Sequence, residues 1–283
     1  MEKVQLRNGV VIPSVGLGTW RITDREQLLE TVDSAYQCGY RLFDTAMAYT
    51  NEMAFGRAVR ELKLPREELF IQDKLWRTCY GYAEAQEACK RSLKKLKTDY
   101  LDAYLIHWPV PAKQCGNYRE LNAETWRGLE QLYREGCVRA IGVCNFKQHH
   151  LEELSETASV LPFMNQVECH PGMWNPELTA YCKERGIQLE AGSPLGNGQL
   201  LSDERLCLMA EKKGVTAAQL CLKWALQHGY VVLPKTTNKE RLRENIETKH
   251  FELSRDEMLI LDGLPFLGGL GLDSDEVNNF EGF

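Results

Sequence analysis

Apolar, β-rich runs alternate with amphipathic helical patterns along almost the whole chain. Between the first two runs, Leu28, Val32 and Ala35 fall on one face of a helix that needs a sheet to cover. A glycine recurs between a helical pattern and the next run, as at Gly39 and Gly229, where a left-handed helix cap is needed. The runs are VGLGTW, RLFDTA, LFIQDKLW, YLDAYLIHWP, VRAIGVCNF, PFMNQVECH, IQLEAGSP and YVVLPKT. Eight strand candidates separated by helices predict an α/β fold, a closed (β/α)8 TIM barrel, rather than an open doubly wound sheet.

Two segments lie outside this alternation. The first, VQLRNGVVIP, predicts an N-terminal β-hairpin with its turn at Asn8-Gly9 that covers the barrel floor. The second, LPFLGGLGLDSDEVNNFEGF, is glycine-rich and aperiodic and predicts a C-terminal tail over the active-site face. Because no linker or low-complexity segment interrupts the chain, we expect residues 1–283 to form a single domain.

The charge balance and the cysteines exclude several classes of protein. With 34 basic and 40 acidic residues the net charge is -6, so no broad basic field exists for nucleic acid or an anionic membrane. The first residues lack the apolar core of a signal peptide and no run approaches a membrane span, which favours a cytoplasmic protein. Ten cysteines without a C-x-x-C pair indicate reduced thiols. Cys169 and His170 lack a second ligand pair, so we expect no metal.

Polar residues close most of the apolar runs. In a (β/α)8 barrel the active site lies at the C-terminal ends of the strands. A single polar residue there is usually a cap or half of a salt bridge, but several that converge on one rim predict an active site. The six residues are Asp44, Lys74, His107, Asn145, Gln166 and Lys235.

Asp44 and Lys74 would hold each other at adjacent strand ends and present the ammonium to Tyr49. A phenol titrates near 10, and we expect the cation to lower the pKa of Tyr49 towards neutrality, which corresponds to roughly 4 kcal/mol. Such a phenol is a general acid for an oxygen that gains charge, and His107 offers that oxygen a second hydrogen bond. The arrangement therefore predicts chemistry on a carbonyl.

These residues lie in motifs through which the chain resembles the aldo-keto reductase family over essentially its full length. The motifs are GLGTW, FDTAMAYTNE, KLW, IHWP, IGVCNF, NQVECHP, SPLG and PKTTNKERLREN. The resemblance is to the microbial branch that is similar to 2,5-diketo-D-gluconate reductase. It implies NADP-dependent carbonyl reduction with a catalytic tetrad of Asp44, Tyr49, Lys74 and His107, in which Tyr49 is the proton donor.

The cofactor is expected on the loops after the last two strands, because no G-x-G-x-x-G motif follows a strand. Lys235 and Arg241 at a helix start match the 2'-phosphate that distinguishes NADP from NAD. The resemblance adds Asn245 near the adenine, and Asn145 and Gln166 at the nicotinamide carboxamide. Altogether the predicted cofactor residues are Gly18, Thr19, Trp20, Asn145, Gln166, Ser193, Leu195, Gly196, Lys235, Thr236, Asn238, Arg241 and Asn245.

Two positions depart from the family pattern. Gly192 stands where an aromatic residue usually stacks on the nicotinamide, and Cys144 replaces a serine with a weaker hydrogen-bonding group. We therefore expect looser cofactor binding, which an aromatic side chain at 192 would tighten. Asp73, beside Lys74, should point to the opposite face of its strand and have a structural role.

The substrate pocket is predicted around the carbonyl site, with Trp20, Trp76 and Trp108 as an apolar wall next to His107. The resemblance adds the loop PVPAKQCGNYRELN and the C-terminal tail as the segments that decide specificity. Without an obvious carboxylate clamp, we expect aldehydes and ketones as substrates, including small dicarbonyls and sugar-derived carbonyls. The chain is expected to act as a monomer.

Two other functions use the same barrel. A buried lysine at a strand end could form a Schiff base as in a lyase of the class I aldolase type, although Asp44 beside Lys74 would raise the lysine pKa and disfavour this. The chain could also bind NADPH and report it to a partner as a sensor with little turnover.

Overall fold

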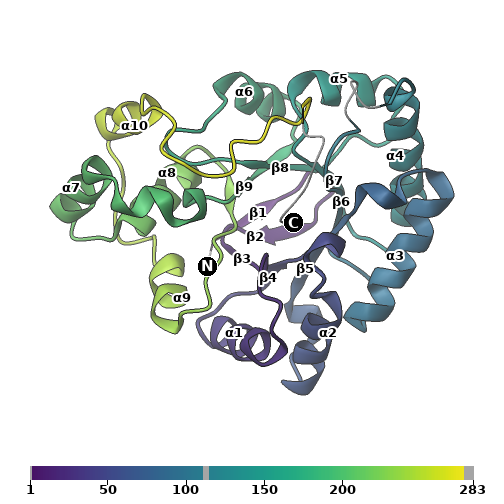
Figure 1. The fold of residues 1–283 in the computed structure, drawn as a ribbon, viewed down its shortest axis with the longest axis horizontal. Helices are drawn as coiled ribbons and strands as arrows, with labels where there is room; N and C mark the ends of the chain where they lie inside the picture. Colours follow the sequence, from purple (N-terminus) through teal and green to yellow (C-terminus); the bar gives the residue numbers. More distant parts are fainter. Residues whose placement is uncertain (1, 111–114, 277–283) are drawn as a thin grey trace.

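Eight parallel strands form a nearly closed barrel in the computed structural model, which describes residues 2–110 and 115–276 (Figure 1). Each strand pairs with the next one along the chain, as expected when a helix returns the chain to the same edge. The strands are β3 (Gly16–Gly18), β4 (Leu42–Asp44), β5 (Phe70–Leu75), β6 (Ala103–Ile106), β7 (Ile141–Cys144), β8 (Met164–Glu168), β9 (Gln188–Gly192) and β10 (Val231–Val232). The predicted (β/α)8 barrel is confirmed.

The barrel closes between its first and last strands, which are short. Val15 forms a parallel bridge with Val232, whose backbone N–H donates to the Ser14 carbonyl over 2.9 Å. Two residues further along, the Gly18 N–H donates to the Pro234 carbonyl over 3.1 Å. These bonds bring the C-terminal end of β10 beside that of β3.

Helices surround the barrel (Figure 1). Leu28, Val32 and Ala35 are fully buried, as their spacing predicted. The glycines expected as helix caps have positive φ, with values of 99° at Gly39 and 87° at Gly229. The helices are α1 (Arg25–Gln37), α2 (Glu52–Glu61), α3 (Tyr82–Leu96), α4 (Tyr118–Arg134), α5 (Gln148–Ser155), α6 (Pro176–Glu184), α7 (Glu204–Lys213), α8 (Ala217–Gln227), α9 (Lys239–Ile246) and α10 (Arg255–Asp262), with short 3-10 helices η1 (Met47–Tyr49), η2 (Arg66–Glu68), η3 (Arg77–Cys79) and η4 (Gly196–Ser202).

The N-terminal hairpin covers the floor of the barrel. Strands β1 (Lys3–Gln5) and β2 (Val11–Pro13) pair antiparallel, and Gly9 in the turn has φ 87°. Arg7 donates to the Leu161 carbonyl over 3.0 Å, and Asn8 donates to the Arg139 carbonyl over 2.9 Å. Both carbonyls lie just before a barrel strand begins, so the predicted position of the hairpin is confirmed.

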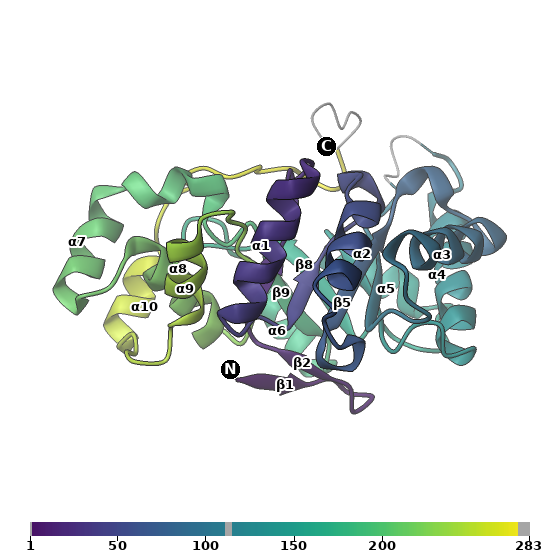
Figure 2. The same ribbon diagram turned by 90° about the horizontal axis from the view of Figure 1, so that it is seen from below.

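The tail crosses the opposite end of the barrel from the hairpin (Figure 2). It follows α10, and residues 277–283 of the predicted tail lie outside the described residues. None of the ten cysteines, all of which lie within the described ranges, is part of a disulfide. Within those ranges, no helix has both the length and the apolar character needed to cross a membrane.

Candidate active site

Asp44, Lys74 and Tyr49 form one hydrogen-bonded line at the C-terminal end of the barrel. Lys74 Nζ lies 2.6 Å from each carboxylate oxygen of Asp44, which ends the neighbouring strand β4. It also lies 3.1 Å from the Thr45 carbonyl and 3.2 Å from the hydroxyl of Tyr49, which belongs to the 3-10 helix after β4. The predicted grouping of these three side chains is therefore present in the structure.

Lys74 is held as a cation. Its side chain is fully buried, and burial is the largest single effect and favours the neutral amine. The charge and hydrogen bond of Asp44, together with Tyr49 and Cys144, outweigh burial and raise the pKa of Lys74 above its ordinary value. A permanently charged ammonium cannot attack a carbonyl to form a Schiff base, so the site disfavours the lyase alternative.

The expectation that Lys74 brings the Tyr49 pKa down towards neutrality is wrong. Burial raises the pKa of Tyr49 above its ordinary value, Lys74 lowers it by less, and Asp44 adds to the rise. The main reason is burial of the phenol, and Asp44 also offsets part of the effect of the cation. Tyr49 is therefore a neutral O–H donor at physiological pH.

His107 faces Tyr49 as a neutral imidazole. The two ring centroids are 5.7 Å apart with the planes at 77°, and Trp76 packs on His107 at 5.3 Å. Burial and the charge of Lys74 keep the pKa of His107 well below its ordinary value. A neutral imidazole can offer a hydrogen bond to an oxygen next to the Tyr49 hydroxyl.

Asp73 points away from this group, as the alternation of the strand predicted. It is fully buried, and burial together with Glu52 of α2 raises its pKa well above the ordinary value. Its environment is therefore the layer between the barrel and the helices.

A cavity of about 530 Å³ opens above the tetrad. Asp44, Tyr49 and His107 form part of its wall, and ten of the predicted cofactor residues also line it. These are Gly18, Trp20, Asn145, Gln166, Ser193, Leu195, Lys235, Thr236, Arg241 and Asn245.

Three predicted cofactor residues are not among those that line the cavity. Thr19 is buried, and its hydroxyl donates to the Asp44 carbonyl over 2.9 Å. Asn238 caps helix α9, because its side chain accepts from the Arg241 N–H over 2.9 Å. Gly196 is buried at the start of η4 with φ 52°. Thr19 and Asn238 thus shape the site through the backbone that they fix.

The end of the cavity near α9 suits an anion. Lys235 and Arg241 are exposed, and within the described ranges neither forms an ion pair. They flank the N-terminus of an eight-residue helix, where backbone N–H groups and the helix dipole favour negative charge. These residues fit the phosphate groups of a dinucleotide.

Several residues that line the cavity have a left-handed backbone, which glycine and asparagine adopt more readily than other residues. Arg21, Asn145, Ser193 and Asn197 have φ between 45° and 63°. Non-glycine residues with strained backbones are held in place by the structure around them and are enriched at active and ligand-binding sites. Sequence reasoning did not name Arg21 or Asn197, although Asn197-Gly198 carries the same turn signal as Asn8-Gly9.

The two positions that depart from the family pattern lie at the cavity. A Cβ atom added at Gly192 would meet Val167 O at 3.5 Å and Gln166 at 3.6 Å, which are ordinary contacts, so the position accepts a Cβ atom. Cys144 Sγ accepts from Asn145 Nδ2 over 3.2 Å, and burial raises the pKa of this thiol. Both positions adjoin the predicted carboxamide residues.

The predicted tryptophans differ in position. Trp20 and Trp108 line the cavity, whereas Trp76 is not among its lining residues and packs on His107. The Trp108 backbone is fixed by Tyr80, whose hydroxyl bonds to both its N–H and its carbonyl. Residues 111–114 of the predicted specificity loop lie outside the described residues.

The tail is fastened across the cavity by two sets of contacts that sequence reasoning missed. Glu168, at the end of β8, accepts from the Leu270 N–H over 2.7 Å and the Gly271 N–H over 2.8 Å. Further along, Lys147 Nζ lies 2.5 Å from Asp273 and 2.7 Å from Asp275. Glu168 closes an apolar run and could have been counted among the strand-end polar residues.

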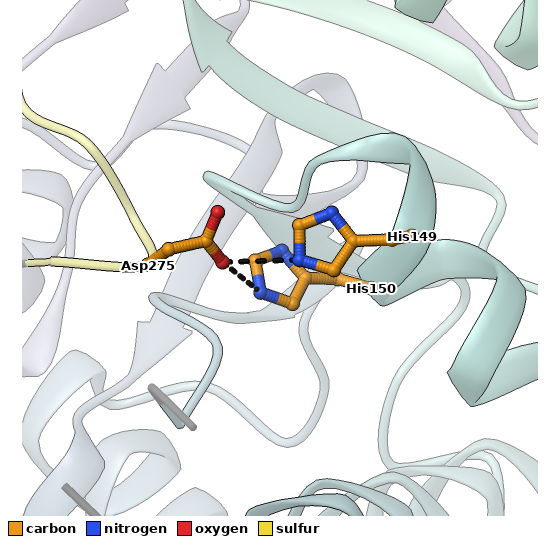
Figure 3. Close-up of side chains that lie close together, drawn as sticks. All are labelled: His149, His150 and Asp275. Atoms are coloured by element: carbon orange, nitrogen blue, oxygen red, sulfur yellow. Dashed lines mark hydrogen bonds and ion pairs between the residues drawn. The ribbon is translucent and has the colours of Figure 1, made fainter. Parts of the chain in front are cut away.

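Asp275 also contacts two histidines of α5 (Figure 3). His149 Nε2 and His150 Nε2 each lie 3.0 Å from Asp275 Oδ1, and this is the one group within the described ranges whose spacing would suit a metal. However, the Lys147 backbone N–H donates to His150 Nδ1, so the proton of this imidazole is on Nε2. The His150 Nε2 proton is donated to Asp275. The two histidines and Asp275 therefore hold the tail against α5 and do not form an unoccupied set of metal ligands.

Known proteins share this architecture over almost the whole chain. The sequence matches the model of the Aldo/keto reductase family over residues 14–264, which include all eight barrel strands. A glyoxal reductase of Bacillus subtilis is 45% identical over 276 residues, covering 98% of this chain and 97% of that protein. Methylglyoxal reductase DkgA of Escherichia coli K12 is 40% identical, covering 96% and 97%. The crystal structure of MGS-M4, an aldo-keto reductase from a deep-sea metagenome library, superposes with a TM-score of 0.90 at 38% identity, covering 98% and 100%.

Proposed function

The chain belongs to the aldo/keto reductase family, and from this premise we propose that it reduces an aldehyde or ketone to an alcohol with hydride from NADPH and a proton from Tyr49. One observation carries the proposal. A neutral phenol lies 3.2 Å from a buried ammonium and next to a neutral imidazole, at the wall of a cavity whose far end suits a phosphate.

The tetrad acts on the carbonyl oxygen. When bound, NADPH supplies the hydride that reduces the carbonyl carbon. Tyr49 and His107 hydrogen-bond the oxygen, and the Tyr49 proton moves to it as negative charge develops. The phenolate that remains faces the Lys74 ammonium, which stabilises it and is itself kept charged by Asp44. The raised pKa of the resting phenol is compatible with this role, because an alkoxide is far more basic than a phenolate.

Small dicarbonyls are the substrates that we propose first. Two relatives that share 40% or more of their residues with this chain are named for glyoxal and methylglyoxal. The wall near Tyr49 carries the apolar rings of Trp20 and Trp108. The test is the loss of NADPH absorbance with methylglyoxal and with a reactive aromatic aldehyde, together with identification of the alcohol. Tight NADPH binding without consumption on any carbonyl would contradict the reductase and favour the sensor alternative.

Arg241→Ala should weaken the binding of NADPH at least tenfold and leave that of NADH nearly unchanged. A charge-assisted hydrogen bond to a phosphate contributes about 1.5–3 kcal/mol, and only NADPH has the 2'-phosphate. Fluorescence titration of both cofactors measures the ratio of the two dissociation constants. Arg243→Ala is the matched control, because Arg243 lies exposed on the same helix but not at the cavity. An unchanged ratio in Arg241→Ala would contradict the assignment.

Gly192→Tyr should bind NADPH more tightly than the wild type. A ring at this position can stack on the nicotinamide, and its Cβ meets only ordinary contacts. We expect a decrease of the NADPH dissociation constant by about threefold to tenfold, corresponding to roughly 0.5–1.5 kcal/mol for an aromatic pair. Gly192→Ala supplies the Cβ without the ring, so equal binding by the two variants would rule out stacking.

A further inference from the structure

Glu190 lies in the barrel interior in a position that the chemistry above does not use. It stands in the middle of β9 between Leu189 and Ala191 and is fully buried. Gln72 Nε2 donates to Glu190 Oε2 over 2.7 Å and to Asp44 Oδ1 over 2.9 Å. Gln166 Nε2 donates to the same two oxygens, over 3.0 Å and 3.2 Å. The two amides thus bridge the same two carboxyl groups.

These four side chains form a closed ring of hydrogen bonds. An amide nitrogen has two N–H donors, so Gln72 and Gln166 each use both donors within the ring. The ring brings together side chains from β4, β5, β8 and β9. One member, Asp44, is the partner of Lys74, and another, Gln166, lines the cavity. A change at Glu190 therefore reaches both the tetrad and the predicted carboxamide site.

Burial and the charge of Asp44 favour a protonated Glu190, and they outweigh the hydrogen bonds from Gln166 and Gln72, which lower its pKa. The other carboxyl oxygen of Glu190, Oε1, has no hydrogen-bond partner among the described residues, and a charged carboxylate in this buried position is costly. The titratable groups that face it are Asp44 and Lys74 on β4 and β5, and Cys144 on β7. Burial is the main cause that raises the pKa of Glu190, to about 7.

We propose that Glu190 is a positioning residue of the active site, which holds Asp44 and Gln166 in place through the two bridging amides. The proposal rests on the reductase function. This role of Glu190 makes the rate of carbonyl reduction depend on pH, because ionisation of Glu190 places a second negative charge beside the Asp44 and Lys74 pair. That charge opposes formation of the Tyr49 phenolate, so carbonyl reduction should slow as the pH rises through about 7.

The first test is the pH profile of kcat between pH 5.5 and 8.5 for the wild type and Glu190→Gln. Glutamine has the shape of a protonated glutamate and keeps an oxygen for both amides, so the variant should retain the low-pH rate and lose the decline near pH 7. Glu130→Gln is the control: Glu130 is a buried carboxylate in α4 that accepts from Ser159 N and Val160 N. It should keep the wild-type profile. A decline that persists in Glu190→Gln would overturn the proposal.

Glu190→Leu tests whether Asp44 and Gln166 are positioned by the hydrogen bonds of Glu190 or only by its volume. Leucine has a similar volume but no acceptor, so both amides lose a partner. We expect a lower kcat and weaker NADPH binding than in Glu190→Gln at pH 6. Equal kinetics of the two variants would show that the ring does not position Asp44 or Gln166.

A second readout does not depend on turnover. A carboxyl whose native pKa lies above its unfolded value of 4.5 favours the native state below that value, and this stabilisation is lost as the pH rises through about 7. The Tm of the wild type should therefore fall relative to that of Glu190→Gln between pH 5 and 8. If the wild type does not consume NADPH, the proposed function fails while the Tm comparison still tests the ring. If the Tm difference between the wild type and Glu190→Gln does not change with pH, Glu190 does not titrate in this range and the proposed pH dependence is overturned.

Discussion

Tyr49→Phe should lower kcat for carbonyl reduction by two or more orders of magnitude at neutral pH. The substitution removes one oxygen and leaves the ring, so the group that gives its proton to the carbonyl oxygen is lost. General acid catalysis contributes typically 10²–10⁴-fold, and no other described hydroxyl bonds Lys74 Nζ. The measurement is NADPH consumption with methylglyoxal under saturating conditions.

The matched control is Tyr133→Phe. Tyr133 belongs to α4, and its hydroxyl accepts from Asn8 of the hairpin at the other end of the barrel. This variant should keep full activity. Tyr49→Phe should bind NADPH as the wild type does, which excludes a misfolded cavity as the cause of a low rate. A kcat within a few fold of the wild type would mean that another group supplies the proton.

The strand-end rule explains why the tetrad could be predicted without coordinates. Parallel strands of one barrel bring their C-terminal ends to one rim, so Asp44, Lys74 and His107 had to converge once the eight strands were recognised. Tyr49 follows from its short distance along the chain to Asp44. These positions depend on local sequence and on topology, which the alternation of strands and helices determines.

Two features of the site depend on the assembled environment and could not be predicted. The Tyr49 pKa shifts upwards because burial and Asp44 outweigh Lys74, and the balance of those effects requires the packed structure. Glu190 was not singled out in the sequence, where it is one polar residue within the run IQLEAGSP. Its partners Gln72 and Asp44 lie more than 100 residues away along the chain, and a single sequence carries no sign of such a contact.

Lys74→Met should reduce both stability and activity. Lys74 is fully buried and pairs with Asp44, which is 3% exposed, so the variant leaves a buried carboxylate without its cation. Breaking a buried pair by removing one partner typically costs 3–5 kcal/mol, and we expect the free energy of unfolding to fall by about that amount. Activity should fall with it, because the phenolate of Tyr49 loses the adjacent positive charge. Urea unfolding and NADPH consumption measure the two effects.

The double variant Lys74→Met/Asp44→Asn separates the two effects. Asparagine removes the unpaired charge and keeps an oxygen that can accept from Gln72 and Gln166, so much of the lost stability should return. Activity should not return, since neither new side chain stabilises a phenolate. A double variant no more stable than Lys74→Met would show that Asp44 is not left as an uncompensated charge. A double variant with restored turnover would show that Tyr49 does not need the ammonium.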